Sequence, residues 1–185
     1  MSEDGRYFSI TQKKRNAQEY SILVVDLETK ISDGLDPQYA KTTVDCPRDF
    51  DEPYAWVKGN KIIATTSSGD NVPSFIFDMN EKLTWNLVNG GREGNRRREP
   101  SIISCCCLSA CGKVLAVKWE SSAVLGLYCF ETGLCIGKAY EGNHLDDYIA
   151  LKKKVTEIFF PTSTIDVIGV VQTDHVYILP IEYRE

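Results

Sequence analysis

The sequence lacks long apolar runs and an export signal. No stretch approaches the roughly 18 uninterrupted apolar residues that a membrane-spanning helix needs. Residues 1–6 contain no basic segment followed by an apolar core, so we expect no secretory signal peptide. Hydrophobic residues make up 43% of the 185 residues, which is ordinary for a globular protein. We expect a single folded domain in the cytoplasm or nucleus that is not secreted and does not contact a membrane.

The usual motifs of catalysis are also missing. The Gly-rich segment 90–94 has no following Lys-Ser or Lys-Thr, which a phosphate-binding loop requires. Neither His144 nor His175 has a Ser or Cys in a Gly-x-Ser-x-Gly elbow to activate. The net charge of -5 argues against a general nucleic-acid binder, because such proteins are usually basic. The sequence therefore predicts no enzyme and no cofactor.

Cysteine is present in an unusual arrangement. The chain has seven cysteines, an odd number, at positions 46, 105, 106, 107, 111, 129 and 135. Adjacent cysteines do not form the spaced framework of a small secreted domain, and no Cys-x-x-Cys pair offers zinc ligands. We expect free thiols in a reducing compartment that act as small buried side chains. A metal or redox site in this cluster is the alternative.

Short apolar runs separated by turn residues recur along the chain. The third run of each copy ends at one of four positions, Asp26, Asp78, Cys129 and Pro180, which lie 52, 51 and 51 residues apart. No helical period separates these copies. Phased copies of a four-stranded unit with this length are typical of propeller blades.

The copies predict an all-β fold, a β-propeller-like array of about four four-stranded antiparallel blades in one domain, 1–185. The first copy lacks its first strand and the last copy lacks its fourth, which leaves about 14 strands. The approximate blades are 1–40, 50–90, 100–141 and 153–185. One weak strand is expected near 39–44, within the first long connection.

Incomplete end blades leave two interpretations open. Propellers usually need about four to eight blades to close. The chain is therefore expected to be a partial propeller, either a truncated or alternatively started product or a piece of a longer protein. In the alternative, the last two strands pair with the first two in a strained four-bladed ring. Open blade edges also make self-association possible.

One copy resembles a blade of the WD-repeat family. The resemblance rests on the turn and strand at 109–116, Ser-x-x-Gly-Lys followed by Val-Leu-Ala, and on Glu-Thr-Gly-Leu-Cys-Ile at 131–136. The segment 26–30, Asp-Leu-Glu-Thr-Lys, is similar to the same third-strand end. The chain as a whole looks like a degenerate WD-repeat relative.

The sequence departs from the family pattern in two ways. No Gly-His dipeptide opens a blade, and the Trp-Asp pair is replaced by Val25-Asp26, Phe77-Asp78 and Tyr128-Cys129. The family's pair supports an internal hydrogen-bond network. Its loss puts that network in question, but not the blade.

Basic side chains crowd two inter-blade connections and are candidate partner-binding residues. They are Arg92, Arg96, Arg97, Arg98, Lys152, Lys153 and Lys154. Guanidinium groups match phosphate and carboxylate with paired hydrogen bonds, and both clusters should lie on one rim of a propeller. The alternative is a solvated, mobile loop, which is the commoner outcome for runs of charge.

Two further groups invite a functional interpretation. Trp119 follows the second strand of the best-preserved copy and is a candidate interaction hot spot at a rim, although packing in the core is favoured. The acidic residues Asp45, Asp49, Asp51 and Glu52 lack the spacing of a calcium loop. For them we favour solvation over metal binding.

The expected function is a non-catalytic, WD-repeat-like module for protein–protein interaction, such as a scaffold. Its binding residues are expected in the long connections 31–53, 89–100 and 141–154, because binding usually lies on such loops. The resemblance also implies a substrate receptor beside an F-box, whose helices would belong to a longer protein. The alternative is contact with phosphate or nucleic acid through the arginine and lysine clusters.

Overall fold

The chain folds as β-strands joined by turns in the computed structural model. The structure describes residues 5–14, 19–27, 40–47, 53–66, 74–87, 102–120, 124–139, 154–161, 165–173 and 175–184, which contain 14 strands. Within these ranges no helix is long and apolar enough to cross a membrane. The chain divides into two compact units, 1–86 and 87–185.

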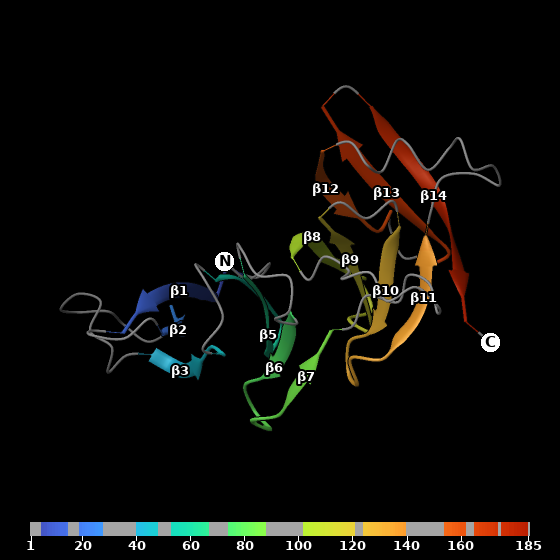
Figure 1. The fold of residues 1–185 in the computed structure, drawn as a ribbon. Coiled ribbons are helices and arrows are strands. Elements are labelled where there is room, and N and C mark those ends of the chain that lie inside the picture. Colours follow the sequence, from blue (N-terminus) through green and yellow to red (C-terminus); the bar gives the residue numbers. More distant parts are fainter. Residues whose placement is uncertain are drawn as a thin grey trace, which may run out of the picture. The chain divides into compact units, whose positions relative to one another are not determined.

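The first unit contains two antiparallel sheets, which we call the first and second blades (Figure 1). The first blade consists of β1 (Tyr7–Lys13), β2 (Tyr20–Asp26) and β3 (Ala40–Asp45). The second blade consists of β4 (Tyr54–Lys58), β5 (Lys61–Thr65), β6 (Phe75–Asp78) and β7 (Thr84–Asn86). Strand β3 lies where the sequence predicts a weak strand, and it extends the first blade beyond residue 40.

The second unit contains the third and last blades. The third blade consists of β8 (Ile103–Leu108), β9 (Val114–Trp119), β10 (Leu125–Cys129) and β11 (Cys135–Ala139). The last blade consists of β12 (Val155–Phe159), β13 (Val167–Gln172) and β14 (Val176–Tyr183). The all-β fold, with three-stranded first and last blades around two four-stranded ones, confirms the predicted fold class.

The strand register shows that the four copies are in phase. Each of the four aligned positions is paired with the first residue of the preceding strand: Asp26 with Tyr7, Asp78 with Lys61, Cys129 with Val114, and Pro180 with Val167. The next residue then donates its backbone N–H to the carbonyl just before that strand. These four N–O distances are 2.7, 3.0, 2.8 and 2.9 Å. The 51–52-residue spacing in the sequence therefore corresponds to one repeated backbone geometry.

The Ser-x-x-Gly turn of the third blade has a direct structural reason. Ser109 Oγ accepts a hydrogen bond from the N–H of Val114 at 3.0 Å, and Ser109 O accepts one from Gly112 at 2.8 Å. Gly112 has a φ of 70°, which lies in the left-handed region that favours glycine. Gly5 and Gly59 take the same region at the equivalent turns, with φ of 72° and 56°. These glycines allow a tight turn before the second strand of each of the first three blades.

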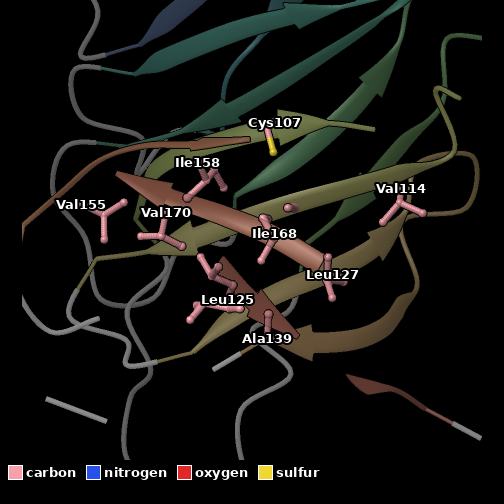
Figure 2. Packing of buried hydrophobic residues seen from close by; sticks show 11 residues of the cluster. Cys107, Val114, Leu125, Leu127, Ala139, Val155, Ile158, Ile168 and Val170 are labelled. Atoms are coloured by element: carbon pink, nitrogen blue, oxygen red, sulfur yellow. The ribbon is translucent and has the colours of Figure 1, made fainter. Parts of the chain in front are cut away.

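Each unit has its own core between its two blades. In the first unit, Tyr7, Val24 and Val44 of the first blade pack with residues of the second blade. In the second unit, the cluster draws on both blades, as Figure 2 shows with side chains that converge from β8, β9, β10, β11, β12 and β13. Its members are Cys107, Val114, Ala116, Leu125, Leu127, Ala139, Val155, Ile158, Ile168, Val170 and Leu179. Apolar contact between the first and second blades thus holds the first unit together, and in the second unit an apolar cluster joins the third and last blades.

One pairing was not expected from separate blades. Strand β14 pairs with β13 over Val176–Pro180 and then with β11 over Ile181–Tyr183, so seven strands join into one sheet (Figure 1). The backbones approach closely at Gly137, where a Cβ atom would lie 2.5 Å from the carbonyl oxygen of Glu182. Glycine at position 137 therefore permits this pairing.

We expect Gly137→Ala to lower the free energy of unfolding by roughly 1–3 kcal/mol, because the added methyl group meets rigid backbone. Denaturant unfolding of the whole chain measures this change. Glu182→Gln is the matched control. It removes the charge from the exposed 3.9 Å contact with Lys138, which contributes at most about 1 kcal/mol. Equal stability of Gly137→Ala and wild type would show that β11 and β14 are not paired in solution.

Candidate partner-binding surface

Asp78 forms a local hydrogen-bond network at the end of β6. Its carboxylate accepts hydrogen bonds from the backbone N–H groups of Asn80 and Glu81 at 2.8 and 3.0 Å. The amide of Asn60 donates to it at 3.2 Å, and Lys61 Nζ lies 3.2 Å away as a buried ion pair. Aspartate at this position of the repeat therefore closes two turns of one blade, although no tryptophan precedes it.

The surroundings of Asp78 also set its pKa. Burial alone would raise the pKa, but the two backbone N–H groups and the Lys61 ammonium outweigh it and lower the pKa below 3.8. Ionised Asp78 is therefore stabilised by folding. This contribution is complete above the unfolded pKa and is lost as the pH falls through the lower folded pKa.

Asp78→Asn should lower the free energy of unfolding by about 3–5 kcal/mol at neutral pH, because it removes the carboxylate from a buried ion pair. Asp26→Asn in the first blade is the matched control, because its ion-pair partner Arg6 is 41% exposed. We expect Asp26→Asn to lower the free energy of unfolding by only about 1 kcal/mol. The difference between wild type and Asp78→Asn should narrow below about pH 4, and a constant difference down to pH 2 would contradict the ionic role of Asp78.

Trp119 is buried. It is the last residue of β9 and is 1% exposed. Its indole N–H donates to the hydroxyl of Tyr128 at 3.2 Å, and the two rings meet edge to face with centroids 6.4 Å apart. The candidate position at a rim is therefore wrong, and the favoured packing in the core is confirmed. A buried side chain whose N–H is satisfied within the same blade offers a partner no surface.

The basic clusters are only partly within the described residues. Lys154 lies just before β12 and is exposed, as expected of a residue in a connection between blades. Arg92, Arg96, Arg97, Arg98, Lys152 and Lys153 lie outside the described residues. Their role as binding residues stays a prediction.

The acidic residues and histidines named in the sequence analysis form no cluster within the described residues. Asp45 is the last residue of β3, and its carboxylate forms an ion pair with Lys14 Nζ at 2.9 Å. Asp49, Asp51, Glu52 and His144 lie outside the described residues. The ring of His175 stacks on Tyr177 with centroids 5.9 Å apart. Within the described part of the chain, no three His, Cys, Asp or Glu side chains are grouped so that they could hold a metal ion.

Lys118 is a buried charged residue that sequence reasoning did not single out. It is 3% exposed, and its Nζ donates to the carbonyl of Trp119 at 2.6 Å. Burial lowers its pKa, against the opposing effects of Cys105 and Glu120. A lysine within the otherwise apolar run Val114–Trp119 is the sequence feature that could have identified it as buried. The local hydrogen bond gives it a structural role.

All seven cysteines are free thiols, and their environments differ. Burial raises the pKa of Cys105 to about 11 and, with the charge of Asp45, that of Cys46 to about 12. Cys111 is exposed in the turn before β9. Its hydrogen bond with Ser109, helped by the backbone N–H of Lys113, lowers its pKa below 9.0.

Cys111 should therefore react with iodoacetamide faster than Cys46 or Cys105 at neutral pH, because the thiolate is the reactive form. Mass spectrometry of the native chain after short exposure gives the order of labelling. Cys111→Ser should remove labelling of this position and leave the slow labelling of Cys46 and Cys105 unchanged. Labelling of Cys105 at the same rate as Cys111 would contradict this assignment.

The last blade has two apolar faces with different exposure. On the face toward the third blade, Ile168 and Val170 are fully buried and Leu179 is 3% exposed. On the opposite face, Val176 and Ile178 are 61% and 54% exposed. Adjacent residues of β14 point to opposite faces, so the contrast between Ile178 and Leu179 is a property of the faces and not of the segment.

The exposed face of the last blade is continuous across its three strands. Opposed residues of neighbouring strands share a face: Phe159 pairs with Gly169 and Gly169 with Ile178, while Val171 pairs with Val176. We call this surface the front face of the last blade. Its apolar members are Phe159, Val167, Val171, Val176, Ile178 and Pro180, and the exposed Glu157, opposite Val171, lies on the same face. An exposed apolar sheet face marks an interaction surface, whereas a single exposed apolar residue does not.

The first blade also has a face turned away from the second blade, but this face is mostly covered, and Val25 on it is 4% exposed. Tyr7, Val24 and Val44 lie on the side that packs on the second blade. On the other side, Ile10 and Leu23 are paired and half-buried, and Thr43, paired with Leu23, is exposed. We call this side, with Phe8, Ile10, Leu23, Val25 and Thr43, the back face of the first blade.

Comparison with known proteins supports the fold. No family model matches the chain, and no curated protein matches it in sequence. A solved structure described as the complex of KlAtg21 with the coiled-coil of AgAtg16 matches over 98% of this chain and 51% of that chain, with a TM-score of 0.58 and 13% identity. That chain is a β-propeller, so the likeness supports a propeller fold, without specifying the WD-repeat type. The present chain spans about half the length of that structure.

Two further solved structures are similar at a lower level. TolB from Acinetobacter baumannii matches over 100% of this chain and 43% of its own, with a TM-score of 0.43 and 16% identity. Kluyveromyces lactis Hsv2 matches over 92% of this chain and 61% of its own, with a TM-score of 0.38 and 9% identity.

Proposed function

We propose that this chain is a non-catalytic protein-binding module of degenerate WD-repeat type. The observation that carries the proposal is the front face of the last blade, where Val176 and Ile178 are more than half exposed beside Val171 and Phe159. Water contact with such a face is unfavourable by about 25 cal/mol per Å² of apolar surface. Covering it with another protein relieves that penalty. Partner contact through a propeller is also what the complex of KlAtg21 with a coiled-coil exemplifies.

Finer parts of the proposal rest on the sequence. The Ser-x-x-Gly turn at Ser109 and the Glu-Thr-Gly turn at Glu131 support the WD-repeat type. A scaffold or an F-box-type substrate receptor within a longer protein is the setting that this type favours. Seven free thiols favour a cytoplasmic or nuclear location.

The test is quantitative cross-linking of the tagged full chain in cells, followed by mass spectrometry. Ile178→Lys places a charge in the centre of the front face, and it should lower the recovery of bound proteins roughly tenfold or more, because the charge cannot be buried without a partner. Leu134→Lys is the matched control. Leu134 is 67% exposed but lies in a turn of the third blade, away from that face. Unchanged recovery with Ile178→Lys would overturn the proposal.

The second candidate function is contact with phosphate or nucleic acid through the basic clusters. The observation that favours it is the run Arg96–Arg98 with Lys152–Lys154 one blade later. Changing Arg92, Arg96, Arg97 and Arg98 together to Glu and measuring binding to RNA and to an acidic peptide tests it. No loss of binding to either ligand would eliminate this candidate.

A further inference from the structure

The first three blades each bring the same two positions together at one end. The first is the residue just before the second strand, whose carbonyl oxygen accepts the backbone hydrogen bond made beside the end of the third strand. The second is the residue at that third-strand end. We call them the donor position, which holds Arg6, Asn60 and Lys113, and the acceptor position, which holds Asp26, Asp78 and Cys129.

In the first two blades, the side chain at the donor position binds a carboxylate at the acceptor position. Arg6 donates to the carboxylate of Asp26 from Nη2 at 3.0 Å and from Nε at 3.3 Å. Asn60 Nδ2 donates to the carboxylate of Asp78 at 3.2 Å. Two independent copies of the repeat therefore hold an anionic group with two oxygen atoms at this place.

The turn after the third strand supplies backbone donors to the same place. In the second blade, the N–H groups two and three residues after Asp78 donate to its carboxylate at 2.8 and 3.0 Å. In the third blade, the equivalent residues are Glu131 and Thr132. Both of their N–H groups bond to the thiol of Cys129, and the hydroxyl of Thr132 adds a third hydrogen bond. The third blade thus keeps the donors although it has no carboxylate.

Lys113 adds a positive charge to this donor set. Its side chain is exposed, and among the described residues its Nζ has no hydrogen-bond or ion-pair partner. An ammonium group without a bound anion therefore stands at the position from which Arg6 binds Asp26. A thiol offers one weak sulfur acceptor, whereas a carboxylate offers two oxygen atoms. The donors of the third blade exceed what the thiol of Cys129 uses.

The thiol of Cys129 is also chemically suited to oxidation. It lies half-buried at the end of β10, so a small reagent in solution reaches it. The hydroxyl of Thr132 and the two backbone N–H groups lower its pKa below 9.0, against the effect of burial. More of the thiol is therefore thiolate at neutral pH, and the thiolate is the form that reacts with peroxide.

We propose that Cys129 is a site of oxidation by hydrogen peroxide, and that its sulfinate takes the place that a carboxylate has in the first two blades. In each of two steps, the sulfur attacks one oxygen of a peroxide molecule. An S–O bond forms, the O–O bond breaks, and hydroxide leaves and becomes water on taking up a proton. Sulfur loses two electrons in each step and each peroxide gains two, through sulfenic acid to sulfinic acid, which ionises.

The product matches the donors that are present. A sulfinate has two oxygen atoms and one negative charge, as a carboxylate has. It can accept the N–H groups of Glu131 and Thr132 and bind the ammonium of Lys113. Hydrogen bonds to a charged group contribute more than those to a neutral one. Oxidation at Cys129 should therefore stabilise the folded chain. This inference concerns a modification site and does not depend on the front face of the last blade.

Peroxide treatment of the purified full chain tests the chemistry. Cys111→Ser serves as the background, because Cys111 is an exposed thiol in the neighbouring turn. Peptide mass spectrometry should find two added oxygen atoms on Cys129 before any on the buried Cys46. The folding equilibrium constant from urea unfolding should rise roughly tenfold. The same treatment of a chain that also carries Cys129→Ser measures the effect of oxidation elsewhere. No dioxidised Cys129, or lower stability when it forms, would overturn the proposal.

Cys129→Asp tests the acceptor position without an oxidant. At neutral pH this variant should have a larger folding equilibrium constant than Cys129→Asn, which has the same shape without the charge. The advantage should be present above the unfolded pKa of aspartate and disappear as the pH falls through its lower folded pKa. An unfolded Cys129→Asp, or one less stable than Cys129→Asn, would show that this position does not hold an oxyanion and would overturn the proposal.

Lys113→Met separates binding of the oxyanion from a general effect of oxidation. The stability gained by peroxide or by Cys129→Asp should shrink several-fold with Lys113→Met and persist with Lys113→Arg. Lys154→Met, which removes another exposed lysine of the same unit, is the matched control and should leave the gain unchanged. An equal gain with Lys113→Met would overturn the assignment of Lys113 as the partner of the sulfinate.

Discussion

Burial of apolar side chains between strands of different blades within each unit is the interaction on which the rest of this structure depends. A strand whose residues are apolar on both sides must have both sides covered, and β5 and β9 are buried at every residue. Burying one such side chain contributes about 1.5–3 kcal/mol relative to exposure. The last blade meets this requirement on one side only, because Ile168 and Leu179 are buried while Val176 and Ile178 are exposed.

The turns at the strand ends keep these faces aligned. Each copy repeats the same backbone hydrogen bond beside the end of its third strand, while the side chain at that position varies from Asp26 and Asp78 to Cys129 and Pro180. The backbone geometry therefore persists where the side-chain network does not. Asp78 has a full set of donors, and the thiol of Cys129 has hydrogen bonds from the equivalent residues Glu131 and Thr132. Pro180 has no side-chain acceptor, and the blade is retained there as well. The repeated backbone geometry thus tolerates different side chains at this position.

Much of the fold was accessible from the sequence because the signals are local. Alternating apolar runs, Gly at left-handed turn positions and the 51–52-residue spacing predicted the strands and their phase. The extra pairing of β14 with β11 was not accessible, because it depends on two edges that are more than 40 residues apart in the chain and on the lack of a side chain at Gly137. For Trp119, the turn that follows it offered a rim position as the alternative to the favoured core position, and its contact with Tyr128 puts it in the core.

The candidate binding surface was likewise only partly predictable from the sequence. The sequence alone determined that β13 and β14 carry apolar residues on both faces, because alternation along a strand is a local property. It directed attention to charged connections, where exposure can be expected from composition. Only the tertiary structure decided that Ile168 and Leu179 are covered while Val176 and Ile178 are exposed. The physical reason is that a residue's environment depends on which blade lies against its face, and that neighbour is absent from the residue's own stretch of sequence.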